Sequence, residues 1–259
     1  VMIYGRQPSD TRKLENSEID VGNRQFGGHE AIIILDNLFV PWERVFMAGE
    51  VAFSGLLVER FAGYHRQSYG GCKAGVGDVL IGAAQALARY QGTDRASHIR
   101  DKIVEMVHLN ETLYACGIAC SAEGKPTPSG TYLIDLLLAN VCKLNVTRFP
   151  YEIARLAQDI AGGLLVTLPS EVDLAHPEMG PYLDKYLRSV ESYATEDRCR
   201  MLRLVENLTL GTGAAAYLTE SMHGAGSPQA QRIMLARLAD LEEKVQCAYK
   251  LAGIKERAS

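Results

Sequence analysis

Residues 61–75 read Phe-Ala-Gly-Tyr-His-Arg-Gln-Ser-Tyr-Gly-Gly-Cys-Lys-Ala-Gly, and they bring His65, Tyr69, Cys72 and Lys73 close together in the chain. If the segment is helical, His65 and Cys72 lie on nearly the same face, about two turns or roughly 10 Å apart along the axis. Tyr69 falls on that side as well. An imidazole and a thiol so placed could reach one compact multi-atom centre or could simply be packed in a core helix, and spacing alone leaves both interpretations open.

The glycine pair Gly70-Gly71 lies in the middle of this stretch. Adjacent glycines either interrupt a helix or let a bulky object come close to the backbone. We therefore expect two helices, over residues 50–68 and 72–91. The second is rich in glycine and alanine, which allow close approach between helices at some cost in helix propensity.

Toward the N-terminus the pattern changes from helical to extended. Residues 1–28 are polar and rich in turn formers, and residues 29–36 (His-Glu-Ala-Ile-Ile-Ile-Leu-Asp) form a short apolar run that predicts a buried strand. Pro41 then favours an extended or turning path. Glu30, at the start of the run, could be an exposed carboxylate at a strand end or could face a ligand.

Beyond residue 91 the apolar periodicity is helical almost throughout, so the sequence predicts a mainly α fold. We expect loops over residues 123–130 and 165–176 and a glycine-rich break over residues 221–228. The expected helices cover residues 97–121, 131–147, 151–161, 180–193, 195–211, 214–220 and 229–250.

The pair Cys116 and Cys120 has a spacing that could bind a metal. Both cysteines continue a stripe begun by Leu109 and Leu113 on one predicted helix face. Because a buried free cysteine behaves as a small apolar residue, we interpret both as core residues.

Three other places could belong to a site or could be ordinary. Gly162 and Gly163, which follow Gln158, could end a helix or could let the backbone approach a phosphate group. Lys73 and Glu220 could be solvated helix charges. His223, between a methionine and a glycine, could face a ligand or lie in a solvated turn.

Composition limits the classes of partner. The 259 residues carry a formal net charge of −4 and a sequence pI near 5.9, which argues against nucleic acid or an anionic membrane as the main partner. We find no apolar run long enough to span a membrane. Six dispersed cysteines do not suggest a secreted disulfide framework, so we expect a reduced cytoplasm. A strand–GxGxxG–helix pattern is absent, so any flavin would not be held by that fingerprint.

The stretch at 61–75, together with the residues after it, resembles the 4-hydroxybutyryl-CoA dehydratase/vinylacetyl-CoA isomerase family, whose members carry FAD and a 4Fe–4S cluster. The resemblance implies an acyl-CoA dehydrogenase-like C-terminal helical bundle over residues 49–259. A remnant of the middle β-domain would precede it over residues 1–48. It also implies a homotetramer, because flavin sites of this superfamily use residues across a subunit interface.

The resemblance makes His65 and Cys72 ligands of the cluster, and His65 could also act as a base when detached from iron. In the family the other two ligands are a Cys-x3-Cys pair from an upstream region, and matching Cys116 and Cys120 to that pair would ignore chain order. We therefore expect the chain to be a C-terminal half. It would need an upstream N-terminal half or a partner chain and would be inactive alone.

The implied reaction is dehydration of 4-hydroxybutyryl-CoA to crotonyl-CoA, with isomerisation of vinylacetyl-CoA, by a radical mechanism on an acyl-CoA substrate. The catalytic residues implied by the family are His65, Glu30, Tyr69, Lys73 and Glu220. The resemblance further places three residues at the flavin pyrophosphate or ribose of a neighbouring subunit: Gln158, Gly162 and Gly163.

Two other functions stay open. A flavin-dependent aromatic hydroxylase of the 4-hydroxyphenylacetate 3-monooxygenase type shares the fold but has no cluster, so His65 together with Cys72 argues against it. The chain could also be a non-catalytic partner subunit.

Overall fold

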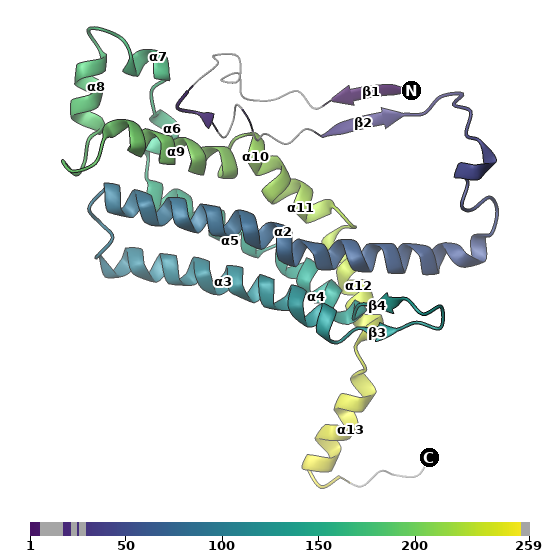
Figure 1. Cartoon of the computed structure of the whole chain (residues 1–259). Helices are drawn as coiled ribbons and strands as arrows, with labels where there is room; N and C mark the ends of the chain where they lie inside the picture. Colours follow the sequence, from purple (N-terminus) through teal and green to yellow (C-terminus); the bar gives the residue numbers. More distant parts are fainter. Residues whose placement is uncertain (6–17, 22–24, 26–29, 255–259) are drawn as a thin grey trace.

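The computed structural model describes residues 1–5, 18–21, 25 and 30–254 (Figure 1). A long central helix contacts several of the other helices. This helix, α2 (Ser54–Tyr90), forms a hairpin with α3 (Ser97–Ala122). It also packs against α4 (Leu136–Val146), α5 (Phe149–Ala161) and α9 (Thr195–Thr209). The mainly α fold expected from the periodicity is therefore confirmed.

The glycine pair does not break α2, so the prediction of two separate helices is wrong. Gly70 faces Gly117 on α3, and a Cβ atom at Gly70 would lie 2.7 Å from the Cα atom of Gly117. Gly71 is exposed, and a methyl group added there would meet nothing within 4 Å. Gly70 thus allows the neighbouring helix α3 to come close to the backbone of α2. This helix–helix packing compensates for the low helix propensity of glycine.

The predicted strand near the N-terminus exists, but the prediction that it is buried is wrong. β1 (Met2–Gly5) pairs antiparallel with β2 (Ala31–Ile34), in a register that sets Met2 opposite Ile34. All residues of both strands are exposed, and Ile32 is 69% exposed. Among the described residues, the two strands of this ribbon mainly contact each other. Most of residues 1–28 lies outside the described residues.

The loop predicted over residues 123–130 and the helix predicted over residues 131–147 both need correction. A short ribbon of β3 (Lys125–Pro126) and β4 (Tyr132–Leu133) occupies the predicted loop and the first part of the predicted helix. α4 therefore begins only at Leu136, where the Asp135 carboxylate accepts a hydrogen bond from the Leu138 amide at 2.7 Å. Such an N-cap satisfies one of the free amides of the first turn.

From residue 164 onward, several helices begin and end at other places than the periodicity predicts. The expected loop at 165–176 holds α6 (Leu164–Thr167) and α7 (Glu171–Leu174), and α8 (Gly180–Leu187) ends before residue 193. The helix expected over 229–250 is split into α12 (Pro228–Leu238) and α13 (Leu241–Leu251). The Asp240 carboxylate caps α13 through the Glu243 amide at 2.8 Å, and α13 projects away from the bundle (Figure 1).

The buried side chains form two apolar clusters. The larger lies among α2, α3, α5 and α9, and the smaller contains Tyr69, Leu113, Cys120 and Cys142. Cys116 is half-buried and packs against the smaller cluster, so the core interpretation of both cysteines on α3 is confirmed. Among the helices described, none has the length and apolar character needed to cross a bilayer.

Candidate functional site

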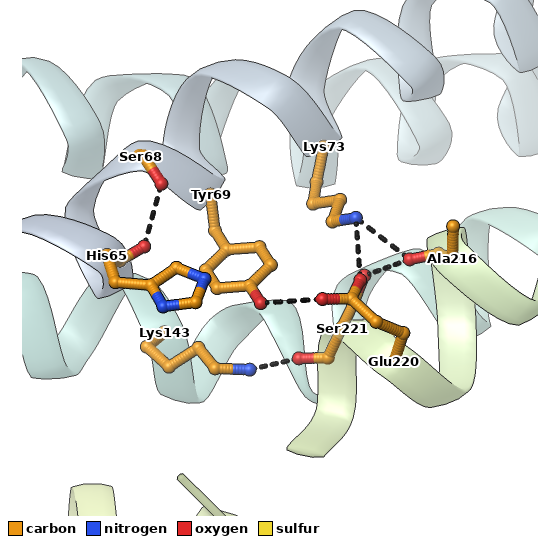
Figure 2. Close-up of polar contacts among 8 residues, drawn as sticks. All are labelled: His65, Ser68, Tyr69, Lys73, Lys143, Ala216, Glu220 and Ser221. Carbon is orange, nitrogen blue, oxygen red and sulfur yellow. Dashed lines mark hydrogen bonds and ion pairs between the residues drawn. The ribbon is translucent and has the colours of Figure 1, made fainter. Parts of the chain in front are cut away.

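A carboxylate held by two side chains of α2 forms the centre of the candidate site (Figure 2). The Tyr69 hydroxyl donates to Oε1 of Glu220 at 3.0 Å, and Nζ of Lys73 lies 3.2 Å from Oε2. Tyr69 and Lys73 are four residues apart and so share one face of the helix. Both oxygens of Glu220 are therefore fixed by groups from a single rigid element.

Glu220 reaches α2 because it ends a π-helical turn, Ala215–Glu220 (η4), between α10 (Thr212–Ala214) and α11 (Ser221–His223). The carbonyl oxygen of Ala216 accepts hydrogen bonds from Lys73 at 2.8 Å and from the Ser221 hydroxyl at 2.6 Å. A π-helical turn is rare and is often found at functional sites. The sequence predicted a helix here but not its type.

Gly224, directly after α11, leaves the room that this contact needs. A Cβ atom there would overlap the Tyr69 hydroxyl oxygen and would lie 2.8 Å from Oε1 of Glu220. The glycine-rich break predicted over residues 221–228 is shorter in the structure, because α11 continues to His223 and α12 (Pro228–Leu238) begins at Pro228. No local signal connects Gly224 with α2.

Lys143 on α4 is a second buried lysine at the site, and sequence reasoning missed it. Its side chain is 0% exposed, and its Nζ atom lies 4.5 Å from the centre of the Tyr69 ring and donates to the carbonyl of Ser221. Burial lowers the pKa of Lys143 to about 8, and the charge of Glu220 opposes that shift. The available signal was the one charged residue in an otherwise uncharged helix.

The same carboxylate affects Tyr69. The pKa of the Tyr69 hydroxyl is raised, first because burial disfavours the phenolate and then because of the charge and hydrogen bond of Glu220. Tyr69 therefore acts as a neutral donor to Glu220. The charges of Cys72 and Glu30 raise this pKa further, which puts both residues within electrostatic reach of the Tyr69 hydroxyl.

Arg66 ties the loop after α11 to the bundle. Its Nε atom donates to the carbonyl of Ala225 at 3.0 Å, and its Nη1 atom donates to Oδ1 of Asn140 at 2.9 Å. Because Asn140 is on α4, this buried guanidinium joins three segments and fixes the chain after Glu220.

His65 and Cys72 lie two turns apart on α2, as the spacing predicts. The half-buried His65 ring stacks on Tyr69 with a centroid distance of 5.3 Å, and Phe61 meets the same ring edge-on at 5.8 Å. Cys72 is exposed, and its thiol pKa is raised because nearby protein desolvates the sulfur, with Lys73 opposing the shift. The described residues include no group of three or more His, Cys, Asp or Glu able to hold a metal ion.

Glu220 and Glu30 line the same open cavity of about 780 Å³. His223 lines it as well, beside the apolar side chains of Leu210 and Leu218. The cavity thus offers two carboxylates and an imidazole to a ligand, over a partly apolar wall. A small polar group with an apolar chain would fit this lining.

Gln158, Gly162 and Gly163 lie elsewhere. Gly162, with φ of 76°, ends α5, and both glycines are exposed. The carbonyl preceding Gly162 accepts a hydrogen bond from Gln91, the residue after the end of α2. Since Lys73 and Gln91 are 18 residues apart on the helix, about 27 Å separates this end of α2 from the carboxylate site. Within one chain these three residues do not join the site.

Comparison with known proteins assigns the chain to a family in two adjacent segments. Residues 54–253 match the model described as 4-hydroxyphenylacetate 3-hydroxylase C terminal. Residues 1–47 match the model described as 4-hydroxyphenylacetate 3-hydroxylase N terminal.

Among curated proteins, the chain is 59% identical over 98% of its length to a Clostridium aminobutyricum protein named 4-hydroxybutyryl-CoA dehydratase/vinylacetyl-CoA-Delta-isomerase, covering 54% of that protein. It is 28% identical over 74% of its length to the oxygenase component of 4-hydroxyphenylacetate 3-monooxygenase from Thermus thermophilus, covering 40% of it. The chain thus spans about half the length of the curated relatives it matches.

Two solved structures have the same fold. An oxygen-tolerant archaeal 4-hydroxybutyryl-CoA dehydratase from N. maritimus superposes with a TM-score of 0.93 and 58% identity, over 99% of this chain and 52% of that one. The oxygenase component of a 4-hydroxyphenylacetate 3-monooxygenase, in complex with FAD and 4-hydroxyphenylacetate, superposes with a TM-score of 0.76 and 24% identity. That comparison covers 85% of this chain and 47% of the other and shows the fold alone.

Proposed function

The chain belongs to the 4-hydroxyphenylacetate 3-hydroxylase family, and we propose that it is part of a 4-hydroxybutyryl-CoA dehydratase with vinylacetyl-CoA isomerase activity. The observation that carries this proposal is the 59% identity with the Clostridium aminobutyricum protein along almost the whole chain. The identity with the Thermus thermophilus oxygenase component is 28%, which favours the dehydratase over the aromatic hydroxylase as the main candidate.

Glu220 is the proposed proton-transfer group of this chain. It lines the cavity, and Tyr69 and Lys73 hold both of its oxygens, so its remaining lone pairs keep a fixed direction. A general acid or base must lie within hydrogen-bond reach of the proton that it moves, and a fixed carboxylate at a cavity wall meets the geometric part of this requirement.

Glu30 is the proposed second carboxylate. Isomerisation of a vinylacetyl thioester to a crotonyl thioester removes a proton from the α carbon and adds one at the γ carbon. Two carboxylates on one cavity suit such a relocation when their surroundings differ. Here Glu220 is held by two partners, whereas Glu30 is exposed directly before β2.

The proposed cofactors are FAD and a 4Fe–4S cluster. His65 and Cys72 fit this proposal in donor chemistry, since a thiolate and an imidazole both bind iron in such clusters. They would supply two of four ligands, and an upstream segment would supply the other two. Bound in this enzyme, the cluster and flavin would provide Lewis-acid and one-electron chemistry. Gln158, Gly162 and Gly163 would hold the flavin of a neighbouring copy, in keeping with their distance from Glu220.

Assembly with further protein is part of the same proposal. The chain spans about half of its relatives, and apolar side chains near the start of α2 are exposed, including Phe61 at 67% and Val58 at 62%. Exposed apolar surface of this kind is typical of an interaction site. We therefore expect an upstream segment or a partner chain to complete the assembly, with an inactive chain in isolation. The homotetramer is what the resemblance to the family implies.

The test is formation of crotonyl-CoA from 4-hydroxybutyryl-CoA and from vinylacetyl-CoA, measured by chromatography. The chain is assayed alone and together with a segment equivalent to the N-terminal half of the Clostridium relative. We expect activity only in the second case, with loss of about 100-fold or more in kcat for Glu220→Gln. Glu152→Gln, which removes an exposed ion pair with Arg155, is the matched control and should leave kcat unchanged.

Two outcomes would contradict the proposal. One is full dehydratase activity in the Glu220→Gln variant. The other is hydroxylation of 4-hydroxyphenylacetate by the assembled protein with reduced flavin and oxygen, in the absence of any dehydratase activity. The second result would support the aromatic hydroxylase instead.

A further inference from the structure

We propose that Lys143 is a positioning residue that holds Glu220 and Tyr69 together, an inference that rests on the proposed function of Glu220. The buried ammonium of Lys143 on α4 donates a hydrogen bond to the carbonyl oxygen of Ser221, the residue directly after Glu220 (Figure 2).

Three elements meet at the Lys143 ammonium. It donates to the carbonyl of Ser221, in the first turn of α11, and it lies 4.5 Å from the centre of the Tyr69 ring on α2. A cation at that distance from an aromatic ring is attracted to its face. Lys143 thus contacts Ser221, the residue next to Glu220. It also contacts the ring of Tyr69, whose hydroxyl donates a hydrogen bond to Glu220. Both halves of the Tyr69–Glu220 hydrogen bond are connected through this one ammonium.

The position of the charge is not explained by packing alone. Lys143 is 0% exposed, and the smaller apolar cluster beside it includes Ala139, Cys142 and Val146 of the same helix. Burying an ammonium is costly, and an apolar side chain of similar length would fill the same space at lower cost. The two contacts that stabilise the charge are both with segments of the site.

The charged and titratable groups that act on Lys143 come from every side of the site. Glu220 on η4 favours its ammonium form, whereas Lys73 and Arg66 on α2 disfavour it, and the Cys142 thiol on α4 is a further neighbour. Burial is the largest cause and lowers the pKa of Lys143 to about 8, with Lys73 and Arg66 adding to the shift and Glu220 and Cys142 opposing it. Lys143 should therefore lose its proton at a lower pH than an ordinary lysine, and with the proton it loses the attraction to the Tyr69 ring. The hold on Glu220 should weaken over the same range of pH.

The experiment compares three variants of the assembled enzyme with the unaltered protein. Lys143→Met keeps the approximate volume and removes the charge, and Lys143→Arg keeps a charge that does not titrate in this range. The matched control is Lys102→Met, which removes a partly exposed ion pair with Asp159 between α3 and α5, away from Glu220. For each protein, kcat and KM are measured from pH 6 to about 9.5, across the ordinary range for acid–base groups.

We expect Lys143→Met to lower kcat by about tenfold or more with little change in KM. Any fall of kcat that follows the loss of the Lys143 proton in the unaltered enzyme should be absent from both Lys143 variants, and Lys143→Arg should recover part of kcat. A crystal structure of Lys143→Met provides a readout apart from activity. The Tyr69 hydroxyl and Oε1 of Glu220, 3.0 Å apart here, should then be beyond hydrogen-bond distance. Lys102→Met should behave like the unaltered protein.

A Lys143→Met enzyme with unchanged kcat, or with an intact Tyr69–Glu220 hydrogen bond, would overturn the positioning role. Failure of the proposed function looks different. In that case dehydratase activity is absent from the unaltered enzyme or survives Glu220→Gln, while the crystal structure of Lys143→Met still reports whether Lys143 holds the pair.

Discussion

The contact of α2 with α3 at Gly70 can be tested by adding one methyl group. In a Gly70→Ala variant the new carbon would lie 2.7 Å from the Cα atom and 3.0 Å from the amide nitrogen of Gly117, and 3.1 Å from Sγ of Cys142. Two of these atoms belong to the backbone of α3, so relief requires the helices to move apart. Overpacking of this kind costs about 1–3 kcal/mol, against about 1 kcal/mol gained from the better helix propensity of alanine.

The adjacent glycine is a matched control in the same helix. A methyl group at Gly71 would meet nothing within 4 Å, and the residue is exposed. Gly71→Ala should therefore raise the free energy of unfolding by about 0.5–1 kcal/mol through propensity alone. Because the propensity term is common to both variants, Gly70→Ala should be less stable than Gly71→Ala by about 1–3 kcal/mol.

Urea unfolding of the chain, followed by far-ultraviolet circular dichroism, measures both values. The slope of the free energy against urea concentration should stay the same in the two variants, so that the midpoints can be compared directly. Equal midpoints would show that Gly70 does not limit the distance between α2 and α3. A Gly70→Ala variant more stable than the unaltered chain would refute the packing argument altogether.

The site gives two other measurable predictions. The folded-state pKa of Lys143, about 8, lies below its ordinary value of 10.5, so between these values the unfolded chain binds a proton that the folded chain does not. Relative to Lys143→Met, the unaltered chain should therefore gain up to about 3 kcal/mol of stability as pH rises from 8 to 10.5, measured by urea unfolding at a series of pH values. In the assembled protein, iron analysis should show that Cys72→Ser largely abolishes the cluster, whereas Cys116→Ser and Cys120→Ser leave it intact; loss of iron with Cys116→Ser would mean that the wrong cysteines were chosen.

The sequence alone shows several side chains of the candidate site, but it does not show how they are arranged in space. His65, Tyr69, Cys72 and Lys73 lie within one segment, and helical spacing is enough to place them along one helix. Glu220 was a candidate only because the chain resembles a known family. Its hydrogen bond with Tyr69 connects residues that are 151 positions apart, and no local pattern encodes such a pair.

Lys143 and Gly224 show the limit of local patterns more sharply. A lysine in an apolar helix and a glycine in a glycine-rich break are each common, and neither sequence neighbourhood points to Tyr69. Their roles depend on how α4 and the turn after α11 pack on α2, because only that packing puts an ammonium beside the ring and a small residue beside the hydroxyl.

The sequence alone determined the helical character of the chain and the core role of Cys120, since apolar periodicity and burial both arise from local spacing. Tertiary structure decided the rest. Contact with Gly117 allows α2 to run unbroken through Gly70, and the lack of a covering layer in the described part of the chain leaves β2 exposed. The π-helical turn brings Glu220 to Lys73. In each case the physical reason is the same: the free energy of these arrangements comes from contacts between segments far apart in the chain, which residue spacing does not record.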